Sequence, residues 1–204
     1  MTKNVIIVKC IVMEAKNIEK IVAEAKKVFL RYGFRRTTMA DLARGAQMSR
    51  PALYLVFPSK EEVFMAVVMR SIKESTEEIR TGIPRLRTAG DKLAFAFEVW
   101  YVRPFEMVLA SPDAGDLLES GCEIACEPLT KAGEDFMAIV TELLKPLVRE
   151  QSRVKLPAAR IAELLCGAAH GFKKTAKDAA ELRHMLNDHL ALILAALRDH
   201  PDRK

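Results

Sequence analysis

The chain has 204 residues, half of them hydrophobic and 29% charged, so it can bury a sizeable core and is too apolar to be disordered. Its formal net charge of +5 is unevenly placed: residues 1–60 hold 12 Lys or Arg against 4 Asp or Glu, whereas residues 61–204 hold 20 against 23. A basic N-terminal part on a mildly acidic remainder predicts a polyanionic partner at one end of the molecule. No apolar run approaches the roughly 20 residues that span a bilayer, so we expect no membrane partner.

The first residues admit several interpretations. Residues 4–12 are apolar and β-branched, which suits a strand, yet no later segment offers a partner strand. Alternatively, Met13 is the natural start, or residues 1–12 form an arm or a forward extension of the first helix. From about Asn17 an apolar period of about 3.6 residues predicts a helix, which Gly33 ends as a C′ glycine. The apolar stripe consists of Ile18, Ile21, Val22, Ala25, Val28, Phe29 and Tyr32.

Two short helices with a three-residue turn are predicted next, over residues 38–57. The first is apolar on the stripe formed by Met39, Leu42 and Ala43, and residues 46–48 make the turn. Ser49 can cap the second helix, and Pro51 suits its first turn because that N–H would be orphaned anyway. Leu53 and Phe57 face inward, which leaves a basic and aromatic outer face of Arg50, Ala52, Tyr54 and Leu55. This is the helix-turn-helix pattern, whose second helix enters a DNA major groove.

The remainder predicts helices only, which gives an all-α fold of about nine helices. Ser59 and Glu62 form a capping box for a helix that runs to about Arg80. Asp91 can cap the next helix, and Pro104 kinks or restarts it. The further expected helices span residues 111–120, 124–151 with a kink at Pro146, 158–174 after Pro157, and 178–199.

The last two predicted helices differ from the others in their apolar faces. The penultimate helix is rich in small residues, which allow close helix approach, and the final helix is apolar nearly all round. A helix buried on two sides at the end of the chain predicts a homodimer through the last two helices, as a four-helix bundle about a twofold axis. The alternative is a buried helix in a monomer.

Residues 17–64 resemble the DNA-binding domain of the tetracycline-repressor (TetR/AcrR) family. The matching residues are Ile21, Ala25, Phe29, Tyr32-Gly33-Phe34, Thr37-Thr38-Met39, Leu42-Ala43, Ser49, Leu53-Tyr54, Phe57 and Ser59-Lys60-Glu61. The resemblance implies a helix-turn-helix DNA-binding domain over residues 13–60 and a ligand-binding and dimerisation domain over residues 61–204. It implies a cytoplasmic homodimeric transcriptional regulator, usually a repressor, that leaves a palindromic operator when a small molecule binds.

The same resemblance implies which residues contact double-stranded DNA. Thr38 and Lys60 would meet phosphates at helix N-termini, and Tyr54 would pack on the DNA backbone beside the N-cap Ser49. The residues facing base edges would be Arg50, Pro51, Ala52 and Leu55. Chemistry agrees, because Arg bonds guanine bidentately, apolar side chains meet the thymine methyl, and Lys60 with the Arg35–Arg36 pair can neutralise phosphates. Two positions depart from the family: Gln47 stands where glycine is usual, and Val56 where His or Tyr is common.

The second domain carries the candidates for effector binding. Large apolar side chains suit an apolar or amphipathic ligand, with Arg103, Glu98 or His170 as a polar handle. The candidate residues are Trp100, Tyr101, Phe105 and Phe136, against the alternative that each is ordinary core.

The cysteines and histidines give little sign of other chemistry. We read the cysteines, Cys10, Cys122, Cys126 and Cys166, as reduced thiols. If helical, Cys122 and Cys126 share one face, as a redox pair, half a metal site, or small buried hydrophobes. The histidines form no metal-binding motif and no phosphate loop is present, so we expect neither cofactor, metal nor enzyme activity.

The residues therefore favour a dimeric, ligand-responsive transcription regulator. Two alternatives stay open: a DNA-bound protein-interaction factor of the same fold without a small ligand, and a small helical enzyme that has borrowed the DNA-binding part.

Overall fold

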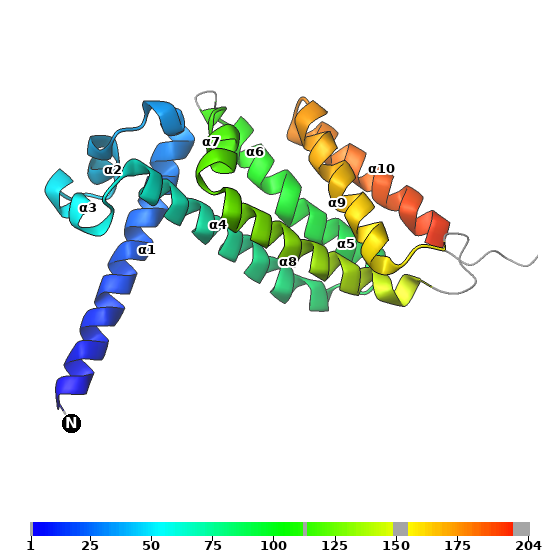
Figure 1. The fold of residues 1–204 in the computed structure, drawn as a ribbon, viewed down its shortest axis with the longest axis horizontal. Coiled ribbons are helices and arrows are strands. Elements are labelled where there is room, and N and C mark those ends of the chain that lie inside the picture. Colours follow the sequence, from blue (N-terminus) through cyan, green and yellow to red (C-terminus); the bar gives the residue numbers. More distant parts are fainter. Residues whose placement is uncertain (1, 112–113, 149–154, 198–204) are drawn as a thin grey trace, which may run out of the picture. The chain divides into compact units, whose positions relative to one another are not determined.

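The computed structural model describes residues 2–111, 114–148 and 155–197, with side chains from Asn17 onward (Figure 1). Every regular element within these residues is helical, which confirms the predicted all-α fold. The α-helices are α1 (Thr2–Arg36), α2 (Met39–Gly45), α3 (Arg50–Val56), α4 (Lys60–Gly82), α5 (Ala89–Phe97), α6 (Arg103–Leu109), α7 (Leu117–Ile124), α8 (Cys126–Leu144), α9 (Ala158–Thr175) and α10 (Ala179–Leu197). None of them is long and apolar enough to cross a bilayer.

The chain divides into two compact units by its internal contacts. The head consists of residues 1–71 and 111–126, and the body consists of residues 72–110 and 127–204. Helix α7 therefore belongs to the head, although its neighbours along the chain, α6 and most of α8, belong to the body. The division at residue 60 expected from the sequence stays a prediction.

Helix α1 starts at Thr2, so the first residues extend the first helix and the strand interpretation is wrong. A strand would need a partner, and the described chain contains none. The predicted break at Gly33 is confirmed, because its φ of 74° and ψ of 174° lie in a region that essentially only glycine adopts. The Thr37 hydroxyl donates to the Gly33 carbonyl at 2.5 Å and holds the chain in this turn.

The core of the head is aromatic at the end of α1. Phe29 packs edge-on against Phe64 of α4 at 5.1 Å between ring centroids, and Phe34 lies 5.0 Å from Phe64. Leu42 and Leu53, one from each short helix, are fully buried beneath α2 and α3. The inward stripes predicted from the sequence therefore hold the helix-turn-helix segment on α1 and α4.

In the body, α5 and α6 form one helix interrupted by a π-helical turn, η2 (Glu98–Val102). Pro104 has no N–H to donate four residues back, and the Arg103 N–H instead donates to the Glu98 carbonyl, five residues back. The predicted effect of Pro104 thus appears as a widened turn just before it. That turn carries Tyr101 into the core while Glu98 remains half-buried.

Several helix ends differ from the sequence predictions. Thr88, not Asp91, caps α5: its hydroxyl accepts the Asp91 N–H at 3.0 Å and donates to the Asp91 carboxylate at 2.6 Å. The short helix expected over residues 111–120 lies later, as α7. The kink predicted at Pro146 is instead the end of α8, which passes into a 3-10 turn over Lys145–Leu147. Proline has no N–H with which to continue the hydrogen bonds of the α-helix. Residues 149–151 and 198–199 of the expected helices lie outside the described residues.

Candidate nucleic-acid interface and ligand groove

The N-terminus of α2 is closed by a reciprocal pair of hydrogen bonds. The Thr38 hydroxyl accepts the Asp41 N–H at 3.3 Å, and the Asp41 carboxylate accepts the Thr38 N–H at 3.1 Å. The Thr38 hydroxyl also donates to the Asp41 carboxylate at 2.6 Å, and this bond, together with the bond from the Thr38 N–H, lowers the pKa of Asp41. Thr38 therefore stands exposed at a helix N-terminus, the position at which a phosphate is favoured.

The turn between α2 and α3 contains a left-handed residue. Gln47 has a φ of 57°, as the usual glycine at this position suggested. The Met48 N–H donates to the Ala43 carbonyl at 2.9 Å, which satisfies one of the last carbonyls of α2. The turn is therefore held by backbone bonds while Gln47 carries the conformational strain.

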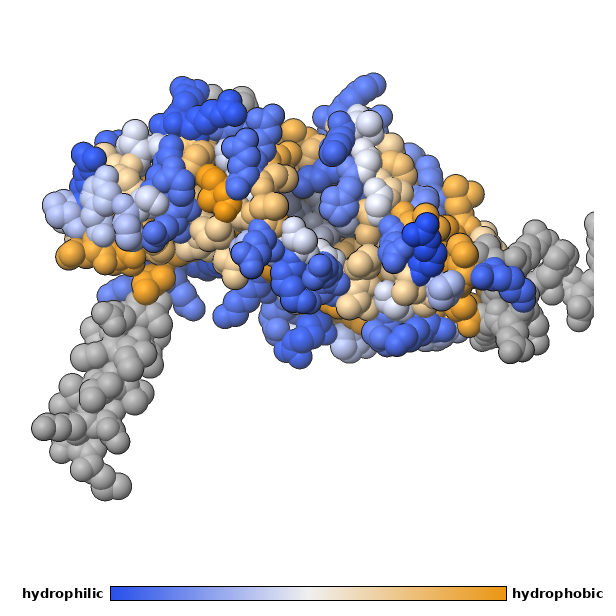
Figure 2. Space-filling model, viewed as in Figure 1, coloured by the Kyte–Doolittle hydropathy of each residue, from blue (hydrophilic) through white to orange (hydrophobic). Residues whose placement is uncertain are grey.

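Helix α3 presents most of its side chains to solvent. The Ser49 hydroxyl accepts the Ala52 N–H at 3.3 Å, so the predicted N-cap is confirmed. Leu53 is buried, whereas Leu55 is 90% exposed and Tyr54 is 40% exposed. Figure 2 shows hydrophobic side chains at the surface of the part of the head that holds α2 and α3, next to charged ones. The predicted base-facing residues, Arg50, Pro51, Ala52 and Leu55, thus share one short exposed helix.

Two basic side chains predicted to contact DNA have partners within the head. Arg50 donates from Nη2 to the Tyr54 hydroxyl at 3.2 Å and lies 5.4 Å from the centre of that ring. Lys60 donates from Nζ to the Phe34 carbonyl at 2.9 Å and lies over the Phe34 ring at 4.2 Å. Lys60 is therefore half-buried against the end of α1.

Sequence reasoning missed the residue that binds the end of α1. Asp116, just before α7, accepts the Phe34 N–H at 2.9 Å and the Arg35 N–H at 2.7 Å through its two carboxylate oxygens. Arg35 also pairs with Glu119 at 3.4 Å. These partners are more than 80 residues apart in the chain, so no local sequence signal could have revealed them.

The body contains a groove of about 390 Å³ between the η2 turn, α8 and α9. Its lining residues are Tyr101, Leu129, Thr130, Gly133, Met137, Glu163, Cys166, Gly167 and His170. Among the predicted ligand residues Tyr101 lines the groove, whereas Trp100 and Phe136 stack behind it at 4.9 Å between ring centroids and Phe105 is buried. Whether these four residues bind a ligand stays a prediction.

Polar groups of α9 and η2 contact one another in the groove. His170 Nδ1 lies 2.8 Å from the Cys166 carbonyl, which can only accept, so Nδ1 carries the proton. The Tyr101 hydroxyl lies 3.3 Å from the same nitrogen. Burial raises the pKa of Cys166 to about 11 and raises that of Tyr101 further. Both groups are therefore neutral at physiological pH.

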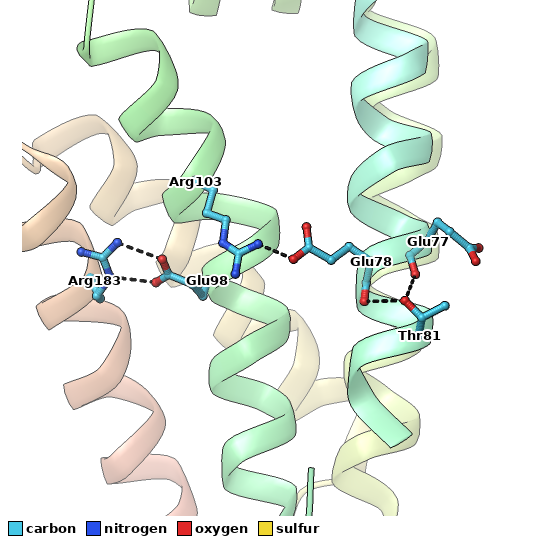
Figure 3. A network of polar contacts seen from close by, with 6 residues as sticks. All are labelled: Glu77, Glu78, Thr81, Glu98, Arg103 and Arg183. Atoms are coloured by element: carbon cyan, nitrogen blue, oxygen red, sulfur yellow. Dashed lines mark hydrogen bonds and ion pairs between the residues drawn. The ribbon is translucent and has the colours of Figure 1, made fainter. Parts of the chain in front are cut away.

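Glu98 and Arg103, the other two polar residues predicted to contact a ligand, form ion pairs within the body (Figure 3). Glu98 receives a bidentate Arg183 from α10 at 2.8 and 2.9 Å, and Arg103 pairs with Glu78 of α4. The hydrogen bonds that Arg183 donates to Glu98 raise the pKa of Arg183. Neither Glu98 nor Arg103 lines the groove, and together they tie α4 and α10 to the η2 turn.

The two cysteines predicted to share a helical face do not do so. Cys122 lies in α7 and Cys126 begins α8, and between them Ala125 has φ −112° and ψ 32°, which breaks the helix. Within the described residues no group of three or more His, Cys, Asp or Glu side chains could hold a metal ion.

The outer faces of α9 and α10 expose apolar side chains. Leu192 is 70% exposed and Leu164 is 44% exposed. Figure 2 shows hydrophobic side chains at the surface along α10.

Residues 21–67 match the family model described as bacterial regulatory proteins, tetR family. Two proteins of Bacillus subtilis (strain 168), both described as uncharacterized HTH-type transcriptional regulators, are similar: YfiR is 36% identical over 64 residues, 31% of this chain, and YuxN is 28% identical over 99 residues, 48% of this chain. The matched stretches span about a third of the length of each of these relatives, 31% and 33%.

Solved structures share the fold over most of the chain. A transcriptional regulator from Cytophaga hutchinsonii has a TM-score of 0.68 at 19% identity, covering 88% of this chain and 95% of its own. A TetR/AcrR-family regulator from Thermobifida fusca has a TM-score of 0.63 at 20% identity, covering 86% of this chain and 96% of its own. A regulator from Saccharomonospora viridis, solved in complex with choline, has a TM-score of 0.65 at 16% identity, covering 87% and 96%.

Proposed function

Because the chain belongs to the TetR family of bacterial regulatory proteins, we propose that it is a DNA-binding transcriptional regulator that represses genes until a small effector releases it from its operator. The observation that carries this proposal is α3, a capped helix that exposes Arg50 and Leu55. A leucine that is 90% exposed has no packing role in the folded head. It suits contact with a thymine methyl in the major groove, where Arg50 can bond guanine.

The DNA contacts divide into positioning and base reading. The helix N-termini at Thr38 and Lys60 are positions at which phosphates are favoured, and Tyr54 can pack on the sugar-phosphate backbone. Ser49 holds the first turn of α3, while the base-reading residues are Arg50, Pro51, Ala52 and Leu55.

The regulator acts as a cytoplasmic homodimer through α9 and α10. The support for this is the exposed Leu164 and Leu192 on helices that are already buried on their other faces. Two hairpins that bury these side chains against each other form a four-helix bundle about a twofold axis. A twofold dimer presents two α3 helices, which suits a palindromic operator with half-sites about one helical turn apart.

Effector binding in the groove of the body shifts the population away from the DNA-binding form. One connection along the chain suits this coupling. Helix α8 lines the groove and follows directly on α7, whose preceding residue Asp116 binds the end of α1 within the head. The presence of a lined groove favours a small-molecule effector over the alternative of a protein-interaction factor with no small ligand.

The test is selection of bound sequences from a random DNA pool, followed by sedimentation of the complex. We expect an enriched palindrome that binds one dimer, with an affinity that falls steeply as salt rises. Recovery of no enriched sequence would overturn the assignment as a sequence-specific regulator. Enrichment of a single half-site that binds one monomer would overturn the proposal that the regulator binds DNA as a dimer.

A further inference from the structure

We propose that the groove between η2, α8 and α9 binds an amphipathic organic cation, an ammonium group that carries a short apolar chain. This inference deepens the proposed function, since it names the class of effector that the groove accepts. It rests on the charge of the groove lining, on the hydrogen-bond acceptors at its polar end, and on two glycines that keep it open.

The charge of the groove is negative. Glu163 is its one acidic lining residue, and no lysine or arginine is among the described residues that line it. Glu163 pairs with Arg160 at 2.6 Å, but both side chains are about half exposed, at 49% and 59%, and such a pair contributes little. The carboxylate can therefore turn to a bound cation, whereas a bound carboxylate would meet the like charge of Glu163 and would have to compete with it for Arg160.

The polar end of the groove offers acceptors and an aromatic ring. Because His170 Nδ1 donates to the Cys166 carbonyl, a neutral His170 presents Nε2 as an acceptor. Tyr101 adds a neutral phenol whose ring packs edge-on against His170 at 5.3 Å. An ammonium group is attracted to a carboxylate and to an imidazole nitrogen, and Leu129 and Met137 supply the apolar wall for its chain.

Two glycines inside helices keep the groove open. Gly133 of α8 and Gly167 of α9 both line it, and no described atom beyond the adjoining residues and the local helix backbone lies within 4 Å of the position that a Cβ would take at either one. Packing therefore does not require glycine there, although glycine weakens a helix relative to alanine. Side chains at these positions would occupy the space of the proposed ligand.

The experiment uses the 204-residue chain without DNA and two probes of equal carbon number, hexylammonium and hexanoate. Trp100 is the single tryptophan of the chain and stacks on Phe136 next to Tyr101, so its fluorescence reports on this region. Calorimetry gives the dissociation constants independently of fluorescence. We expect the cation to bind at least about tenfold more tightly than hexanoate.

Variants separate the charge of the groove from its shape. Glu163→Gln should weaken cation binding by about two- to fivefold, since it removes the charge of a half-exposed carboxylate and keeps the shape. Glu142→Gln is the matched control. Glu142 lies in α8 and, like Glu163, forms an exposed ion pair, with Lys145 at 2.6 Å, but it does not line the groove, so the affinity for the cation should not change. Gly133→Leu should abolish binding while the thermal midpoint stays at or above that of wild type.

Three results would overturn the inference: hexanoate binding as tightly as the cation, unchanged cation affinity in Glu163→Gln, or no saturable binding of the cation. The proposed function is tested separately by adding each probe to the DNA complex. Cation binding without DNA release would keep this inference and overturn effector control by the cation. Hexanoate binding with DNA release would keep effector control and overturn this inference.

Discussion

Arg50 and Tyr54 lie one turn apart on the exposed face of α3, and the Arg50 guanidinium donates to the Tyr54 hydroxyl at 3.2 Å while lying 5.4 Å from its ring centre. The flexible arginine is therefore ordered before DNA arrives, which lowers the entropic cost of a bidentate bond to guanine. The hydroxyl can still donate its own proton to a phosphate oxygen.

Tyr54→Phe keeps the ring and removes the hydroxyl. We expect specific operator affinity to fall by about 0.5–1.5 kcal/mol, the worth of one hydrogen bond, with an unchanged thermal midpoint because the hydroxyl is at the surface. Fluorescence anisotropy with operator DNA measures the loss. An affinity equal to that of wild type would show that the pair does not order Arg50.

Asp116→Asn weakens the contact between α7 and the end of α1. The carboxylate accepts two backbone N–H groups at 2.9 and 2.7 Å, whereas an amide has one acceptor oxygen and no charge. We expect the free energy of unfolding to fall by about 1–2 kcal/mol in urea denaturation. Asp135→Asn, whose carboxylate only pairs with Lys131 at an exposed site, is the control and should change stability little.

Gln47→Gly should raise the free energy of unfolding by about 0.5–1 kcal/mol. The φ of 57° costs a non-glycine residue about 1–2 kcal/mol, from which the greater chain entropy of glycine in the unfolded state subtracts a part. Thermal and urea denaturation measure the gain. Gly33→Ala is the opposite change at a φ of 74° and should destabilise the head; a Gln47→Gly variant less stable than wild type would contradict the strain.

Leu192→Glu tests the dimer. This leucine is 70% exposed on α10, and a glutamate there would place two like charges near the proposed twofold axis. We expect a monomer in sedimentation velocity at micromolar concentration, with a loss of operator affinity. Met69→Glu, at a side chain 48% exposed on α4, should remain dimeric. A dimeric Leu192→Glu protein would place the interface elsewhere.

Local signals in the sequence predicted the helix-turn-helix segment well. Ser49 and Gly33 act through bonds or dihedral angles within a few residues, so their roles could be read directly. The choice between two possible N-cap residues was harder to predict. Thr88 and Asp91 both suit the N-cap of α5, and Thr88 is the N-cap because Asp91, in the first turn, can then hydrogen-bond back to it.

Features made by distant segments could not be read from the sequence. Asp116 meets Phe34 across 82 residues, and the groove requires Tyr101, Gly133 and Gly167 to be brought together by three elements. Residue type alone indicates the aromatic candidates, and it does not distinguish Tyr101 at the groove from Phe105 in the core. Cys122 and Cys126 would share a face only if their segment were one helix, and nothing in their spacing predicts the break at Ala125.

The central claim is that α3 reads base pairs through Arg50, and the affinity of Arg50→Ala for its selected operator tests it most directly. We expect specific binding to weaken by about 1–3 kcal/mol, while binding to random duplex DNA at the same salt changes much less. The loss should shrink when the contacted guanine is replaced by 7-deazaguanine, which lacks the N7 acceptor. Specific affinity within error of wild type would show that α3 does not read DNA through Arg50.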